Sequence, residues 1–77
     1  MIEITVKLFA QYRADHFKIE KRSYPKGATV AGVIIETGIP VEQFPIGVIM
    51  VNGRHFDEDH ILQEGDILSL FPKVGGG

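Results

Sequence analysis

The sequence contains no cysteine. Disulfide bonds, thiolate zinc sites, cysteine-ligated iron–sulfur clusters and a catalytic thiol are therefore excluded for this chain. A small domain without disulfides is typical of a reducing compartment. Basic residues are also few, because eight Lys and Arg stand against ten Asp and Glu. Proteins that bind nucleic acids take most of their affinity from a basic surface, so we expect no nucleic-acid partner.

Long hydrophobic runs are absent as well. The longest run of note, residues 46–51, is far shorter than the roughly 20 residues that a membrane-spanning helix needs. Residues 1–5 lack a basic leader, and Glu3 and Lys7 interrupt any apolar core of a signal peptide. We therefore expect a cytoplasmic protein with no membrane partner.

The length of 77 residues corresponds to one small domain, which buries only about 60% of its unfolded surface. This leaves little room for a large active-site cleft. A hydrophobic content of 44% and a net charge of -2 argue against disorder of the whole chain. Three of the nine glycines are Gly75, Gly76 and Gly77, so the glycine excess belongs to the end of the chain. We expect a folded domain over residues 1–72 and a flexible tail over residues 73–77.

The first third of the chain predicts a β-hairpin. Apolar and polar side chains alternate strictly over residues 2–9, which is typical of a half-buried strand. The alternation resumes over residues 17–20 and ends before a turn at residues 24–27. The short connection between the two strands favours antiparallel pairing.

A short helix is predicted next. Thr29 is a suitable N-cap, and Gly38 stands where a left-handed C-terminal residue belongs. Between them the apolar face follows helical spacing, at Val30, Val33 and Ile34.

The last part of the chain predicts further strands. The run at residues 46–51 is apolar on both sides, as expected for a central strand covered by the helix. Asn52-Gly53 is a strong signal for a type I′ turn into a short return strand at residues 54–56. A small apolar plug (Ile61-Leu62) and a last strand (residues 67–71) follow, and Pro72 marks where strand pairing stops. The fold class is α+β, with a mixed sheet of four to five strands on one short helix.

Candidate sites on the domain itself are few. Residues 55–60 hold two histidines and three acidic residues, which could bind a divalent metal. However, the segment follows a tight turn, where charged residues are common. Ser23 and Ser69 lie in predicted strands without the context of a nucleophile elbow. We expect no metal-ligating and no cofactor-binding residues.

The order of elements and the C-terminal residues resemble the β-grasp proteins of the MoaD/ThiS family, which are ubiquitin-like sulfur carriers. The resemblance is strongest over residues 47–77. It rests on Val51-Asn52-Gly53, Leu62-x-x-Gly65-Asp66, Phe71-Pro72-x-Val74 and the terminal Gly76-Gly77. Residues 1–46 match in element order and at the helix entry Gly27-x-Thr29-Val30. The small subunit of molybdopterin synthase is slightly favoured over the thiamine-thiazole branch.

The resemblance implies chemistry at the C-terminal carboxylate of Gly77. An ionised carboxylate is a poor electrophile, so the family uses an E1-like enzyme that adenylates it with ATP and Mg. A sulfur donor then converts the adenylate to a thiocarboxylate. Gly75 and Gly76, which lack a Cβ atom, would thread into a larger synthase subunit. The chain would thus be a protein cosubstrate or a small non-catalytic subunit of a sulfurtransferase, and it would bind no cofactor itself.

Docking to these partners is expected beside the tail, through Phe71, Pro72 and Val74, because aromatic and apolar anchors dominate many interfaces. Ordinary core packing is the alternative for Phe71. Two other functions remain open. The chain could be a ubiquitin-like modifier that is conjugated through Gly77, or a β-grasp binding module with an inert tail.

Overall fold

The computed structural model of the protein describes residues 1–14 and 16–73. These residues form five strands, one α-helix and a short 3-10 helix. In chain order the elements are β1 (Ile2–Leu8), η1 (Ala10–Arg13), β2 (Ile19–Tyr24), α1 (Val30–Thr37), β3 (Ile46–Val51), β4 (Arg54–His55) and β5 (Ile67–Pro72).

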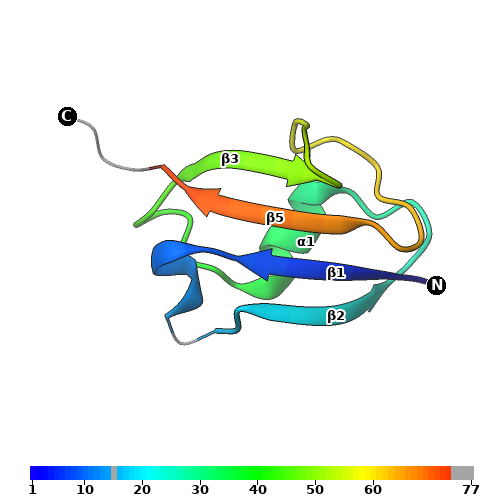
Figure 1. The fold of residues 1–77 in the computed structure, drawn as a ribbon, viewed down its shortest axis with the longest axis horizontal. Helices are drawn as coiled ribbons and strands as arrows, with labels where there is room; N and C mark the ends of the chain where they lie inside the picture. The colour runs from blue at the N-terminus through cyan, green and yellow to red at the C-terminus, as the bar shows by residue number, and fades with distance from the viewer. Residues whose placement is uncertain (15, 74–77) are drawn as a thin grey trace.

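The strands form a mixed sheet in the order β2-β1-β5-β3-β4. β1 pairs antiparallel with β2 and parallel with β5, whereas β3 pairs antiparallel with both β5 and β4. Helix α1 crosses one face of this sheet and leaves the other face uncovered by it (Figure 1). The fold is the ubiquitin-like β-grasp predicted from the sequence.

The helix and its caps are confirmed. The Thr29 hydroxyl accepts a hydrogen bond from the Gly32 amide at 3.2 Å, and Gly38 ends the helix at φ 74°. The Asn52-Gly53 turn is confirmed too, since both residues have positive φ, at 52° and 80°.

The prediction for the second strand is wrong at both ends. β2 begins at Ile19 and continues to Tyr24, where a turn was expected. Pairing with β1 decides these bounds, because Tyr24 lies opposite Ile2 and Ile19 opposite Lys7. Within the polar stretch of β2, the Arg22 side chain donates to both carboxylate oxygens of Glu36 on α1, each at 3.0 Å, and so joins the strand to the helix.

Residues 46–51 form an interior strand, β3, as predicted, but it is not the middle one of the five. β5 occupies the centre, between β1 and β3. β3 lies between β5 and β4, which pairs only with Met50 and Val51. The cause is the parallel pairing of the first and last strands, which periodicity within one segment does not reveal.

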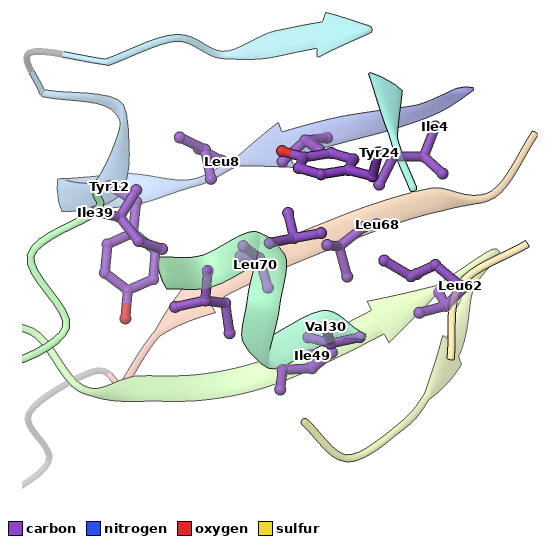
Figure 2. Packing of buried hydrophobic residues seen from close by; sticks show 14 residues of the cluster. Ile4, Leu8, Tyr12, Tyr24, Val30, Ile39, Ile49, Leu62, Leu68 and Leu70 are labelled. Carbon is purple, nitrogen blue, oxygen red and sulfur yellow. The ribbon is translucent and has the colours of Figure 1, made fainter. Parts of the chain in front are cut away.

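The hydrophobic core lies between the sheet and α1 (Figure 2). Val30 and Val33 of the helix are fully buried against Leu68 and Leu70 of β5 and their neighbours. Of the predicted apolar plug, Leu62 is 1% exposed and belongs to this core, whereas Ile61 is 51% exposed. Within residues 1–14 and 16–73, no helix combines the length and apolar character that crossing a membrane requires.

Candidate functional site

The candidate site begins where β5 leads into the C-terminal segment. β5 ends at Pro72, which lies opposite Ile46 of β3. One further contact holds the chain, since the Lys73 amide donates to the Pro45 carbonyl at 2.7 Å. Lys73 itself is exposed. The predicted site residues Val74, Gly75, Gly76 and Gly77 lie outside the described residues.

An apolar patch lies on the sheet face away from α1, beside this end of β5. Phe71 follows the buried Leu70 and so faces the opposite side, with Val48 of β3 directly across from it. The ring of Phe9 stacks on that of Phe71, with centroids 4.1 Å apart and planes 12° from parallel. Met50 has the same facing as Val48 along β3. We call these four half-buried residues, Phe9, Val48, Met50 and Phe71, the outer-face patch.

The predicted docking residues differ in their surroundings. Phe71 belongs to the outer-face patch and not to the core beneath α1. Pro72 is buried, so it offers little free surface to a partner. Its described role is to end β5 close to Pro45 and Ile46.

A positively charged side chain, that of Arg13, lies at the border of the outer-face patch. The Arg13 guanidinium lies over the Phe9 ring, 5.2 Å from its centroid. Its Nε donates to the Leu8 carbonyl at 2.8 Å, which fixes its position. Arg13, Phe9 and Phe71 therefore form a continuous stack that ends in a positive charge.

Phe9 and Arg13 were not predicted from the sequence as site residues. A signal for Phe9 was available, because it shares the alternation of Glu3, Thr5 and Lys7, whose side chains face away from the core. An aromatic residue at a position of that parity marks an apolar spot on an otherwise polar face. For Arg13 the local sequence carried no comparable signal.

Two of the motifs behind the family resemblance meet in space. The Asn52 side chain donates to Asp66 Oδ1 at 2.9 Å and accepts from the Ile67 amide at 2.9 Å. The Asp66 Oδ2 atom accepts from the Gln63 amide at 2.7 Å. These bonds join the β3–β4 turn to the start of β5 and so hold the strand that carries Phe71.

Residues 55–58 of the acidic segment border a hollow of about 520 Å³ along β3, and Val48 of the outer-face patch lines the same hollow. The ring of His60 stacks on that of Phe56, with centroids 3.9 Å apart. Within the part of the chain that the structure describes, no three His, Asp or Glu side chains come together as a metal site.

The fold and the patch beside the C-terminal segment define a ubiquitin-like β-grasp protein. The sequence matches the ThiS family over residues 6–77, and the chain belongs to that family. The resemblance to the MoaD/ThiS proteins is thereby confirmed. No curated protein matches the sequence.

Solved structures with the same fold cover nearly the whole chain. A putative molybdopterin converting factor subunit 1 from Pyrococcus furiosus has a TM-score of 0.77 and 30% identity, covering 96% of this chain and 100% of that one. Small archaeal modifier protein 1 of H. volcanii has a TM-score of 0.76 and 20% identity, with 96% and 100% covered. A complex of subunits 1 and 2 of molybdopterin-converting factor from Helicobacter pylori contains a chain with a TM-score of 0.67 and 21% identity, with 99% and 100% covered. At this identity, the last two show that the fold is shared.

Proposed function

We propose that the protein is a sulfur carrier. The Gly77 carboxylate is adenylated, converted to a thiocarboxylate, and then donates its sulfur in cofactor biosynthesis. The observation that carries this proposal is the family match, which extends from residue 6 through Gly75, Gly76 and Gly77. The absence of cysteine fits this role, because the sulfur is carried on the carboxyl carbon and not on a thiol.

The chemistry needs partners, because a carboxylate does not react with sulfur nucleophiles unaided. An E1-like enzyme supplies ATP and Mg, and a carboxylate oxygen of Gly77 attacks the α-phosphorus as pyrophosphate leaves. The sulfur of a sulfide ion then attacks the acyl carbon, AMP leaves with the oxygen that it bonded, and the thiocarboxylate remains. Glycines suit such a tail because they pass close to a partner's backbone. Ordering each residue costs about 1–2 kcal/mol, which docking elsewhere must offset.

We assign the docking to the outer-face patch. Its Phe71 and Val48 lie opposite each other only two residues before Lys73, so one partner can hold the patch and reach the carboxylate together. Half-buried aromatic residues such as Phe9 and Phe71 are typical interface anchors. The Arg13 charge at the border favours a partner surface that is apolar with a carboxylate at its rim. The H. pylori fold neighbour, which was solved as a complex of subunits 1 and 2, supports a larger synthase subunit as one such partner.

Molybdopterin is the favoured destination of the sulfur, and the thiamine thiazole is the next. The P. furiosus protein, described as a putative molybdopterin converting factor subunit, supports the first at 30% identity. One assay distinguishes the two destinations of the sulfur. The thiocarboxylated protein is mixed with the large subunit of molybdopterin synthase or with thiazole synthase, each with its substrate, and we expect product only with the former.

The test of the carrier function is a change in intact mass. The protein is incubated with an E1-like enzyme, ATP, Mg and sulfide, and we expect the mass gain of one oxygen exchanged for sulfur. Removal of Gly77 or of ATP should abolish the gain, whereas Ile35→Ala, on the exposed side of α1, should leave it intact. No mass gain, under conditions that convert a known carrier, would refute the proposal and favour a binding module with an inert tail.

A second candidate function is conjugation to other proteins through Gly77. The H. volcanii modifier, which has the same fold, favours it. Incubation of the tagged protein in cell extract with ATP should then give high-molecular-weight conjugates that disappear when Gly77 is removed. Conjugates without any thiocarboxylate would favour the modifier function over the carrier function.

A further inference from the structure

A bulge in β3 lies opposite the end of β5. Val48 pairs with Phe71 and Ile46 pairs with Pro72, so two steps along β3 correspond to one step along β5. Gly47 is therefore the extra residue of the bulge. Figure 1 shows the two strands side by side up to the end of β5.

The need for glycine at this bulge comes from space and not from backbone conformation. The φ angle of Gly47 is not in the positive range, so an L-residue could adopt its backbone. However, a Cβ atom placed there would lie 2.7 Å from the Lys73 Cα and 2.8 Å from the Lys73 nitrogen. It would also lie 2.9 Å from the Pro72 carbonyl oxygen. All three are backbone atoms, so no side-chain rotation can relieve the contact.

This close approach coincides with the last described hydrogen bond of the chain. The Lys73 amide donates to the Pro45 carbonyl, at 2.7 Å, across the same bulge. Lys73 is thus held between the Pro45 carbonyl and the bare Cα of Gly47. A side chain on Gly47 would push the Lys73 backbone away and lengthen or break this bond.

We propose that Gly47 is a positioning residue for the reactive end of the chain. By lacking a side chain, it admits the Lys73 backbone to β3 and thereby fixes the point from which residues 74–77 continue. The inference rests on the proposed carrier function, because that function requires a partner to hold the patch and the Gly77 carboxylate together.

The short distance to Gly77 makes this position important. Four residues follow Lys73, and they extend at most about 14 Å. A displacement of Lys73 by even one residue length, about 3.3 Å, would use roughly a quarter of that reach. Misplacement of about 1 Å at a reacting centre can already reduce turnover strongly.

The test compares the wild-type protein with Gly47→Ala in the adenylation and thiocarboxylation assay. We expect kcat to fall about tenfold or more, while KM changes by less than about twofold, because the outer-face patch is intact. In the free protein, the Lys73 amide should exchange its hydrogen faster, with the amides of Leu68 and Leu70 unchanged. Gly32→Ala is the matched control, since a Cβ there meets only Thr29 Oγ1 at 3.5 Å, and its kcat and KM should equal those of the wild type.

A second variant separates positioning from a general loss of structure. One glycine inserted after Gly75 in the Gly47→Ala chain restores reach, and we expect it to recover part of kcat. No recovery, together with faster exchange throughout β5, would overturn the inference, as would equal kcat or a change in KM alone. The proposed function is refuted by a different result. It predicts that the wild-type chain is converted to the thiocarboxylate, whatever the effect of Gly47→Ala.

Discussion

The ring of Phe9, one residue beyond β1, stacks on the ring of Phe71 near the end of β5, with the centroids 4.1 Å apart. The parallel pairing of the two strands produces this contact, and the Phe9 amide extends it by donating to the Leu70 carbonyl at 3.2 Å. The two residues come from opposite ends of the sequence. An apolar patch beside the reactive segment therefore exists only when the fold is complete.

Phe9→Ala should weaken binding to a larger synthase subunit. The substitution removes the ring that supports both Phe71 and Arg13, and loss of an interface anchor typically costs about 2 kcal/mol, or roughly 30-fold in Kd. Titration calorimetry with the purified partner measures the effect. Ile35→Ala is the control, because this side chain is 80% exposed on α1 but lies outside the patch. Equal affinity of Phe9→Ala and the wild type would show that docking occurs elsewhere.

Asn52 should contribute to stability in two separable ways. Asn52→Gly keeps the positive φ of 52° without strain but loses the side-chain bonds to Asp66 and to the Ile67 amide. We expect a loss of about 1–3 kcal/mol in the free energy of unfolding. Asn52→Ala loses the same bonds and adds the cost of a left-handed backbone, about 1 kcal/mol more. Urea denaturation measures both variants.

The order of the two Asn52 variants is the decisive result. If Asn52→Ala proves as stable as Asn52→Gly, the left-handed backbone at this position contributes nothing to the difference in unfolding free energy. If both match the wild type, the hydrogen bonds to Asp66 and Ile67 do not stabilise the junction of the turn with β5.

The helix could be predicted from sequence because its signals are local. Thr29, Gly38 and the apolar face between them all lie within one short segment, and each has a direct physical role there. The β3–β4 turn was predictable for the same reason, from Asn52-Gly53 alone. The ends of β2 were misplaced because they depend on its register with β1, which places Tyr24 opposite Ile2 and Ile19 opposite Lys7.

The candidate site could be predicted only in part. Phe71 and Pro72 were predicted as docking residues from a family motif. Their surroundings differ, because Phe71 faces outward and Pro72 is buried. The stack of Phe9 on Phe71 depends on strand pairing between the two ends of the chain. The role of Gly47 is visible only in the structure, against the Lys73 backbone.

Tyr24 should make the protein less stable at high pH. Its hydroxyl donates to Glu36 at 2.8 Å, and burial, followed by this bond, raises its pKa from 10 to about 12. A phenol whose pKa is raised by folding contributes stability below pH 10 that is lost as the pH rises to about 12. Tyr24→Phe should therefore show a shallower alkaline decline in the free energy of unfolding, measured with urea at each pH.

Tyr12 also contributes to the loss of stability at high pH that the Tyr24→Phe experiment measures. Burial also raises the pKa of Tyr12, so Tyr24→Phe should retain part of the alkaline decline. A variant that declines as steeply as the wild type would show that Tyr24 ionises equally well in the folded and unfolded protein.

Glu36 should show the opposite dependence at low pH. The Tyr24 hydroxyl, and then the Arg22 guanidinium at 3.0 Å, hold the pKa of Glu36 below its usual value of 4.5. A carboxyl whose pKa is lowered by folding contributes stability above pH 4.5 that is lost as the pH falls through its folded pKa. Glu36→Gln should lose this component, so its unfolding free energy should change less than that of the wild type between about pH 5 and pH 3.

The size of the Glu36 effect is limited by exposure, since its side chain is 53% exposed and solvent screens the interaction with Arg22. High salt should reduce it further, because the charge pair is screened while the Tyr24 bond remains. Glu42→Gln, which removes an exposed carboxylate away from Arg22 and Tyr24, serves as the control. If Glu36→Gln follows the wild type, the bridge between β2 and α1 contributes nothing to the acid stability of the fold.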